Sequence, residues 1–298
     1  MKTNSIRRLN LIAALGLITS LVIGCQGVPP YDSEEQERLG TMGKNFDHFT
    51  HTINEHRLKG VHAGSHDKPA FLFIHGTPGD WKAWGRFLGD SELSEKTFML
   101  AIDRPGFGQS APGTPVLSLE TQASVILQSA LKEHPGPFVI VGHSYGGPIQ
   151  LEIAANFPEH VSRLIILAGA IDPVLQKERW YHHLANTWAG RVILPEPLNV
   201  STQEMLSLPS ELKRLQSQLK AIDKPVTVIQ GGKDWLVPSG NAEYARKQLS
   251  GADVSVIQIA DQGHFLPWKE YDLVKREILK HADSSKLTWG ELPTVSNH

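Results

Sequence analysis

The sequence predicts an α/β protein whose sheet is mostly parallel, and three observations lead to that prediction. Short runs rich in β-branched and aromatic residues alternate with helix-length segments from about residue 48 to residue 281. Six of the runs are separated by segments long enough for the crossover helices that parallel strands need. The composition, with 40% hydrophobic and 20% charged residues, is typical of a globular protein. We therefore expect an eight-stranded, mostly parallel sheet flanked by helices.

The expected strands and helices follow one another along the chain. An opening hairpin is expected over residues 50–53 and 57–61, followed by six strands at 70–74, 98–102, 138–141, 164–167, 226–230 and 254–259. Helices are expected at residues 81–88, 119–133, 145–157, 240–248 and 270–281. In the third of these, Ile149, Ile153 and Phe157 recur at intervals of four, which gives the helix one apolar face to bury on the sheet.

The alternation of strands and helices lapses between Leu167 and Val226, for almost sixty residues. Because an ordinary connection is far shorter, we expect a small helical cap or lid at residues 171–222, inserted after the sixth strand. Its clearest helix is expected at 211–221, where apolar residues at spacings of three and four form a stripe (Leu212, Leu215, Leu219 and Ile222). The core would then comprise residues 45–170 and 223–284, with a C-terminal tail at 285–298.

The first 24 residues have the layout of a signal peptide. Residues 1–8 are polar and basic, and residues 9–23 form an almost unbroken apolar run that ends at the small residue Gly24. That run is shorter than the roughly 20 residues that a membrane-spanning helix needs. We therefore expect export of the protein and removal of residues 1–24.

Cys25 is the only cysteine in the chain. With the four residues before it, Cys25 resembles the lipobox of bacterial lipoproteins, which implies lipidation of Cys25 as the first mature residue. The resemblance further implies anchoring in the bacterial cell envelope and, with Gln26 next, at the outer membrane. A cleavable signal with an incidental cysteine is the alternative. Residues 25–44 are proline-containing and acidic, and we expect them to form a solvated tether.

The charge distribution argues against nucleic acid as a partner. The formal net charge of the chain is -2, and the Lys and Arg residues are scattered along the sequence. A nucleic-acid-binding surface needs a clustered basic patch, which this sequence lacks.

The strongest chemical signal is a G-x-S-x-G sequence placed between a strand and a helix. The expected strand at 138–141 runs into Gly142, Ser144 and Gly146, and the next expected helix follows directly. In this context the motif forms a sharp turn that exposes the serine hydroxyl as a nucleophile. The helix N-terminus also places positive potential where an oxyanion would develop. We predict that Ser144 is the nucleophile.

A serine nucleophile needs a base within reach and an acid that orients the base. Asp234 follows the expected strand at 226–230, and His264 follows the expected strand at 254–259. The carboxyl ends of parallel strands share one edge of the sheet, where such sheets bind ligands. We therefore predict Ser144, His264 and Asp234 as a catalytic triad. In the loop after residues 70–74, the backbone N–H of Thr77 is expected to form an oxyanion hole together with that of Tyr145.

Five segments together resemble the successive landmarks of the α/β-hydrolase superfamily, namely residues 75–79, 103–110, 142–147, 232–234 and 263–264. The resemblance implies the α/β-hydrolase fold and a serine hydrolase that works through an acyl-enzyme without metal or cofactor. Superfamily members with an aspartate nucleophile are epoxide hydrolases and haloalkane dehalogenases, and Ser144 argues against both. Some members supply the acid from the position of Asp172, which is therefore the alternative to Asp234.

The substrate is the least determined part of the prediction. Aromatic residues in the cap and near the catalytic ends, Trp180, Trp235 and Phe265 among them, suggest an apolar acyl or alcohol group, although they could equally be packing residues. A small or medium carboxylic ester is expected first, which corresponds to EC 3.1.1. Lactone, amide or carbon–carbon bond hydrolysis and peracid formation use the same triad. A non-catalytic envelope lipoprotein is the alternative of another class. The sequence does not predict an oligomeric state.

Overall fold

The computed structural model describes residues 46–282 of the chain. The expected signal peptide at 1–24, the lipidation site Cys25, the tether at 25–44 and the tail at 285–298 all lie outside the described residues. Within residues 46–282, no helix combines the length and the apolar character needed to cross a membrane.

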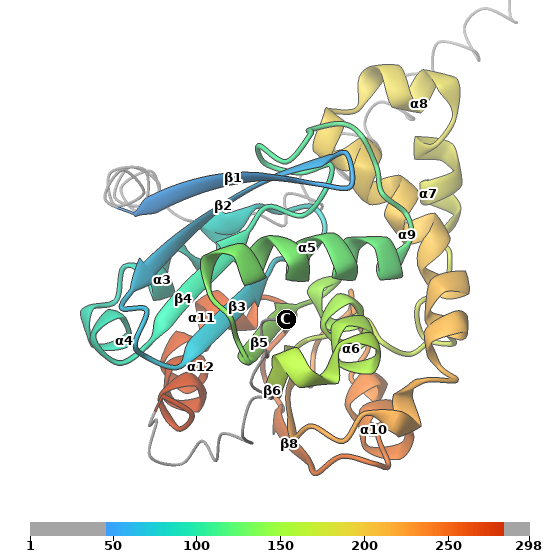
Figure 1. Cartoon of the computed structure of the whole chain (residues 1–298). Coiled ribbons are helices and arrows are strands. Elements are labelled where there is room, and N and C mark those ends of the chain that lie inside the picture. Colours follow the sequence, from blue (N-terminus) through green and yellow to red (C-terminus); the bar gives the residue numbers. More distant parts are fainter. Residues whose placement is uncertain (1–45, 283–298) are drawn as a thin grey trace, which may run out of the picture.

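The centre of the molecule is one eight-stranded sheet with the order β1-β2-β4-β3-β5-β6-β7-β8 (Figure 1). The contacts of β2 with β1 and with β4 are antiparallel, and all other neighbours in the sheet are parallel. This confirms the predicted α/β-hydrolase type of sheet. The strands are β1 (Asp47–Ile53), β2 (His56–Gly64), β3 (Ala70–Ile74), β4 (Phe98–Ile102), β5 (Phe138–His143), β6 (Val161–Leu167), β7 (Val226–Gly231) and β8 (Val254–Ile259).

Helices cover both faces of the sheet. One face carries α5 (Leu119–Glu133), α6 (Gly146–Asn156) and α10 (Gly240–Gln248). The other face carries the short segments η2 (Trp81–Trp84), α3 (Gly85–Leu88), α4 (Ser91–Lys96) and α11 (Leu266–Lys269), together with α12 (Tyr271–Leu279). A last short turn, η3 (Pro158–His160), leads from α6 into β6.

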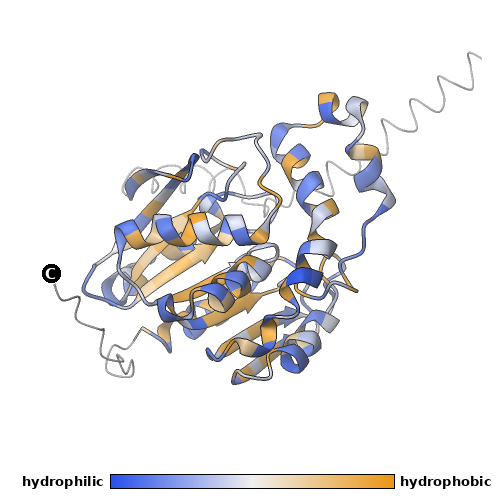
Figure 2. Ribbon diagram, turned by 45° about the vertical axis from the view of Figure 1, so that its right-hand side comes forward, coloured by the Kyte–Doolittle hydropathy of each residue, from blue (hydrophilic) through white to orange (hydrophobic). Residues whose placement is uncertain are grey.

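The alternation of side chains along each strand divides the apolar core into two layers. In β3, Leu72 and Ile74 pack towards α5 and α6, while Phe71 and Phe73 pack towards α3 and α12. All four side chains are buried. Figure 2 shows the resulting hydrophobic strands enclosed between helices whose outer faces are hydrophilic. A sheet buried on both faces needs continuous apolar strands, as this sequence supplies.

Local sequence signals fix the helix ends. Ser118 begins α5 by accepting a hydrogen bond from the N–H of Thr121 at 3.1 Å, and Asp90 begins α4 in the same way through the N–H of Leu93. These caps satisfy backbone donors that a helix N-terminus otherwise leaves free. The observed α5 and α10 have the predicted bounds, and α6 and α12 are slightly shorter than predicted.

The cap lies between β6 and β7, as predicted, and consists of α7 (Trp180–Ala185), α8 (Trp188–Ile193), α9 (Glu196–Leu215) and η4 (Leu219–Ala221). The prediction of its main helix at 211–221 was wrong, since α9 begins at residue 196 and ends at residue 215. Pro209 lies inside α9. The helix continues past this proline because buried residues on both sides of it, including Leu208 and Leu212, hold it against the core.

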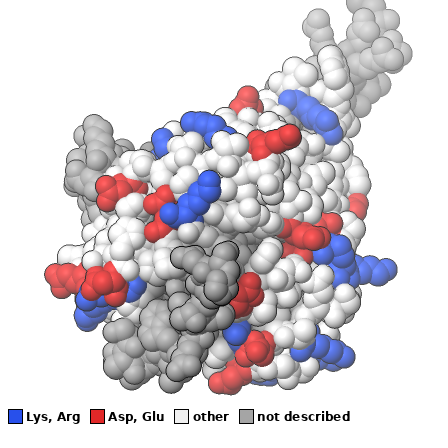
Figure 3. Space-filling view, viewed as in Figure 1, with Lys and Arg blue, Asp and Glu red and all other residues white. Residues whose placement is uncertain are grey.

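The surface carries both signs of charge. On the face shown in Figure 3, acidic and basic side chains are interspersed rather than gathered by sign.

Candidate active site

Ser144 lies in the sharp turn between β5 and α6, in a left-handed backbone conformation with φ 55°. Such a φ is uncommon outside glycine, and the surroundings hold it in place. The N–H of Ser144 donates to the carbonyl of Leu167 at 3.0 Å, and its own carbonyl accepts from Gly147 and Ala170. A Cβ at position 146 would come within 2.3 Å of the Ile74 carbonyl oxygen, so only glycine fits there. The turn therefore presents the predicted nucleophile at the carboxyl edge of the sheet.

Asp234 and His264 form a buried hydrogen-bonded pair at the same edge. The Nδ1–H of His264 donates to Oδ2 of Asp234 at 2.8 Å, and both residues are 6% exposed. The other carboxylate oxygen accepts from the backbone N–H groups of Leu236 and Val237 at 2.9 and 2.8 Å. Because these amides fix the carboxylate, its second oxygen is left to orient the imidazole, with Nε2 free to act as a base.

Asp172 does not contact His264 in this arrangement. Its Oδ1 accepts a hydrogen bond from the N–H of Val174 at 2.7 Å, and its own N–H donates to Asn241. The structure thus pairs His264 with the first of the two predicted acids, Asp234.

His143 connects the serine turn to the histidine. Its Nε2–H donates to the backbone carbonyl of His264 at 3.0 Å, and the two rings lie 4.7 Å apart. Burial, reinforced by the neighbouring His264, lowers the pKa of His143 to about 3. His143 is therefore neutral, and its hydrogen bond holds the backbone of His264, the predicted base. Within residues 46–282 no hydrogen bond joins Ser144 Oγ to His264 directly, and in free enzymes this bond is often long.

The loop after β3 lies against Ser144. A Cβ at Gly76 would come within 2.9 Å of the Ser144 Cβ, which shows how closely the two segments approach. The backbone N–H groups of Thr77 and Tyr145 donate no hydrogen bond to any described residue. Two free amides beside a serine hydroxyl are the arrangement that an oxyanion site requires.

The predicted substrate-contacting aromatics are placed differently from one another. Trp180 and Trp235 are 63% and 61% exposed, and Arg179 links them by donating to the Trp235 carbonyl at 3.0 Å. Phe265 is half-buried, with its ring 5.6 Å from that of His264. Of the three, Phe265 is the one in ring contact with a predicted triad residue.

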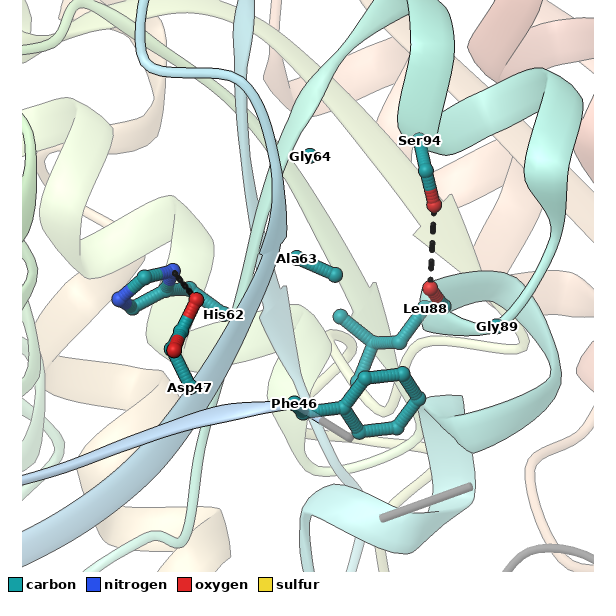
Figure 4. A pocket seen from close by; sticks show the side chains of 8 residues that line it. All are labelled: Phe46, Asp47, His62, Ala63, Gly64, Leu88, Gly89 and Ser94. Atoms are coloured by element: carbon teal, nitrogen blue, oxygen red, sulfur yellow. Dashed lines mark hydrogen bonds and ion pairs between the residues drawn. The ribbon is translucent and has the colours of Figure 1, made fainter. Parts of the chain in front are cut away.

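A hollow of about 400 Å³ lies at the opposite edge of the sheet, and Figure 4 shows the side chains that line it. Its lining includes Phe46, His62 and Gly64, and Gly64 pairs with the first residue of β4. Since Ser144 follows the last residue of β5, this hollow is separate from the predicted triad. Within the described part of the chain, no group of three or more His, Cys, Asp or Glu side chains is arranged to hold a metal ion.

Two buried residues behind the loop were not singled out from the sequence as site residues. Arg104 and Glu204 are fully buried and form an ion pair of 2.7 Å that reaches the loop of Thr77. They are 100 residues apart in the chain, so no local pattern indicated their contact.

Comparison with known proteins identifies the family. Residues 71–276 match the sequence model of the alpha/beta hydrolase family, and this range contains Ser144, Asp234 and His264. The chain therefore belongs to the alpha/beta hydrolase family.

The relatives named below are distant in sequence. The chain is 25% identical over 248 residues to pyrrolizixenacetamide deacetylase of Xenorhabdus hominickii, covering 72% of this chain and 92% of the relative. It is 23% identical over 252 residues to the dihydrolipoyllysine-residue acetyltransferase component of the acetoin cleaving system of Pseudomonas putida. That match covers 74% of this chain but only 65% of the relative's length.

Solved structures share the fold. The crystal structure of a membrane phospholipase A, described as a bacterial virulence factor, superposes with a TM-score of 0.61 at 21% identity. The superposition covers 92% of this chain and 98% of the phospholipase.

Proposed function

We propose that this hydrolase is a serine esterase that cleaves a small or medium carboxylic ester through an acyl-enzyme. The observation that carries the proposal is the meeting of three strand ends at one edge of the sheet. Ser144 follows β5 in a strained turn, and the hydrogen-bonded pair of Asp234 and His264 follows β7 and β8. Strained backbone held by surrounding hydrogen bonds is typical of functional sites.

The reaction would proceed in two steps. His264 Nε2 takes the proton of Ser144 as Oγ attacks the ester carbonyl, and the N–H groups of Thr77 and Tyr145 stabilise the oxyanion. Collapse of the tetrahedral intermediate expels the alcohol, which receives the proton from His264. A water molecule then attacks the acyl-enzyme by the same path and releases the acid. Asp234 keeps the imidazole in the tautomer that has Nε2 unprotonated.

The residue at the turn argues for acyl chemistry over epoxide opening. A carboxylate nucleophile forms an ester intermediate with an epoxide carbon, whereas position 144 holds a serine. Serine needs a general base and oxyanion donors, and we propose His264 and the N–H groups of Thr77 and Tyr145 for these roles. Similar proteins include a deacetylase and also epoxide hydrolases, so the serine at position 144, rather than any relative's name, favours acyl chemistry.

The location of the activity rests on the N-terminus, which lies outside the described residues. We propose that residues 1–24 are removed and that Cys25 is acylated, which would anchor the enzyme in the cell envelope, most simply at the outer membrane. Metabolic labelling with a clickable fatty acid tests this proposal, and labelling that persists in a Cys25→Ser variant would contradict it.

A chain-length series of p-nitrophenyl esters tests the reaction itself. The full-length protein in detergent should hydrolyse one or more esters and should be labelled by a fluorophosphonate probe, and Ser144→Ala should abolish both. Ser201→Ala in α9 is the matched control and should keep full activity. A lactone and an aryl amide in the same panel would show whether ester hydrolysis is preferred. Background rates for both wild type and Ser144→Ala would refute the proposal and favour a non-catalytic lipoprotein, and equal rates above background would remove Ser144 as the nucleophile.

A further inference from the structure

We propose that Arg104 and Glu204 are positioning residues, which hold the Gly76–Thr77 peptide group with its N–H towards the developing oxyanion. The inference deepens the proposed function and rests on it, because it assigns to the cap a part in oxyanion stabilisation. Neither residue touches the substrate. They would act through the backbone of the loop that follows β3.

The ion pair joins the cap to the core. Glu204 lies in α9, Arg104 lies directly after β4 and Asp103, and both side chains are fully buried. The guanidinium donates through Nη1 to Oε1 of Glu204 at 2.7 Å and through Nη2 to Oε2 at 3.0 Å. Gln122 of α5 completes the group by accepting from Nη1 of Arg104 and donating to Oε1 of Glu204. Two parallel donors give the pair a fixed orientation as well as strength.

Both members of the pair also bond the loop. Arg104 Nη2 donates to the carbonyl oxygen of Gly76 at 3.0 Å, and the hydroxyl of Thr77 donates to Oε2 of Glu204 at 2.6 Å. The Gly76 carbonyl and the Thr77 N–H belong to one planar trans peptide group and point in opposite directions. The hydrogen bonds to the Gly76 oxygen therefore fix the direction of the Thr77 N–H. The bond from the Thr77 hydroxyl to Glu204 restrains rotation about the Thr77 N–Cα bond.

His75 strengthens the same peptide group. Its Nε2 accepts from the backbone N–H of Arg104 at 2.9 Å, so its Nδ1 carries the proton and donates to the Gly76 carbonyl at 2.7 Å. Burial, together with the neighbouring guanidinium, lowers the pKa of His75 well below its usual range, which keeps the ring neutral in this tautomer. With two donors on the Gly76 oxygen, polarisation of the peptide makes the Thr77 N–H a better donor.

A purely structural role accounts poorly for this arrangement. Replacing a buried ion pair by apolar residues of similar volume is often neutral or stabilising, so such a pair is weak evidence for stability alone. In this protein the pair makes direct hydrogen bonds to the Gly76 carbonyl and to the Thr77 side chain, one on each side of the peptide N–H that flanks Ser144. These contacts indicate that Arg104 and Glu204 fix the orientation of the loop that follows β3.

The test removes the hydrogen bond from the Thr77 hydroxyl to Glu204 and keeps the Thr77 backbone N–H, which is the proposed oxyanion donor. Thr77→Val deletes the hydroxyl that bonds Glu204 but retains the backbone N–H and nearly the same volume. We expect kcat per active site, titrated with a fluorophosphonate, to fall about tenfold while KM changes little. The loss should stay below the roughly 10²–10³-fold that deletion of an oxyanion donor causes. A boronic acid that mimics the tetrahedral intermediate should lose affinity in parallel with kcat. Thr77→Ser should recover most of the rate.

The controls separate the possible outcomes. Thr202→Val, two residues before Glu204 in α9 and so on another face of the helix, makes the same chemical change away from the loop and should keep the wild-type kcat. Glu204→Gln should reproduce the kcat loss of Thr77→Val with a matching loss of boronic acid affinity. If wild type is active and Thr77→Val keeps its kcat and inhibitor affinity, the positioning inference is wrong and the esterase proposal stands. If wild type hydrolyses no ester and Ser144 takes no label, both fail.

Discussion

The cap consists of two regions that differ in how they are held. Helix α9 packs into the core, with Val200, Glu204 and Leu208 fully buried. Helices α7 and α8 contain no buried residue, and they expose Trp188 and Val192 by 82% and 69%. Figure 1 shows α8 at the end of the cap farthest from the sheet. The insertion is therefore not one lid: α9 belongs to the core that supports the site, and α7 with α8 forms an outer arm.

Removing the buried charge should have the largest effect on stability. Glu204→Ala leaves Arg104 buried without its partner, and we expect a loss of about 3–5 kcal/mol in the free energy of unfolding. Urea denaturation followed by circular dichroism measures the change. A loss below about 1 kcal/mol would show that α9 is held no more firmly than the outer arm.

A pair of identical substitutions compares the two regions through packing alone. Leu208→Ala in α9 creates a cavity at a fully buried site and should cost about 2–5 kcal/mol. Leu184→Ala in α7, where the side chain is 46% exposed, should cost much less. Equal losses from the two variants in the same urea titration would contradict the division of the cap.

The loss of stability in acid should be larger at the buried site than in the outer arm, where burial lowers the pKa of His182 to about 4. The folded-state pKa of His143 is about 3, below its ordinary value of 6.5, so its stabilising contribution is complete above pH 6.5 and declines as the pH falls towards 3. Between pH 7 and pH 4 the loss amounts to at most about 3 kcal/mol.

Substitution of His143 isolates this contribution. His143→Gln should flatten the decline in unfolding free energy between pH 7 and pH 4. His183→Gln, at an exposed position in α7, should leave the slope of wild type unchanged. Asp103, whose pKa burial raises to about 6, acts in the opposite direction, so the difference between variant and wild type is the quantity to measure. Identical slopes in all three proteins would remove His143 from the explanation.

The smallest change in the free energy of unfolding is expected for a substitution in α8, at the tip of the outer arm. Trp188→Ala should change the free energy of unfolding by less than about 0.5 kcal/mol, since a mostly exposed side chain loses little packing. Differential scanning calorimetry with the conservative variant Trp188→Phe as control would detect a larger change. A loss above about 2 kcal/mol would mean that the arm is packed in solution.

Sequence patterns predicted the structure correctly where it depends on the residues of a single segment. The bounds of α5 follow from its cap residue Ser118 and its apolar spacing, and the turn at Ser144 follows from its glycines and flanking strand. The start of α9 could not be found this way, because Pro209 indicates a boundary that tertiary packing overrides. Helix α4 is too short for a periodic signal.

Local sequence patterns could not predict contacts between segments that are distant in the chain. Arg104 and Glu204 are each unremarkable in their own segments, and only the fold brings them together. Aromatic residues in the cap were expected either to contact the substrate or to pack against the core, and Trp180 lies mostly in solvent. Side-chain exposure in an insertion depends on how the insertion packs, and composition does not determine that.

The left-handed conformation at Ser144 also limits which amino acids can replace it. With φ at 55°, β-branched residues are strongly disfavoured, whereas Gly, Asn and Asp occupy this region at little cost. Exchange of Ser144 for aspartate therefore requires little change in the backbone conformation. On evolutionary timescales, a lineage with this turn could pass between an alcohol and a carboxylate nucleophile without rebuilding the scaffold around it.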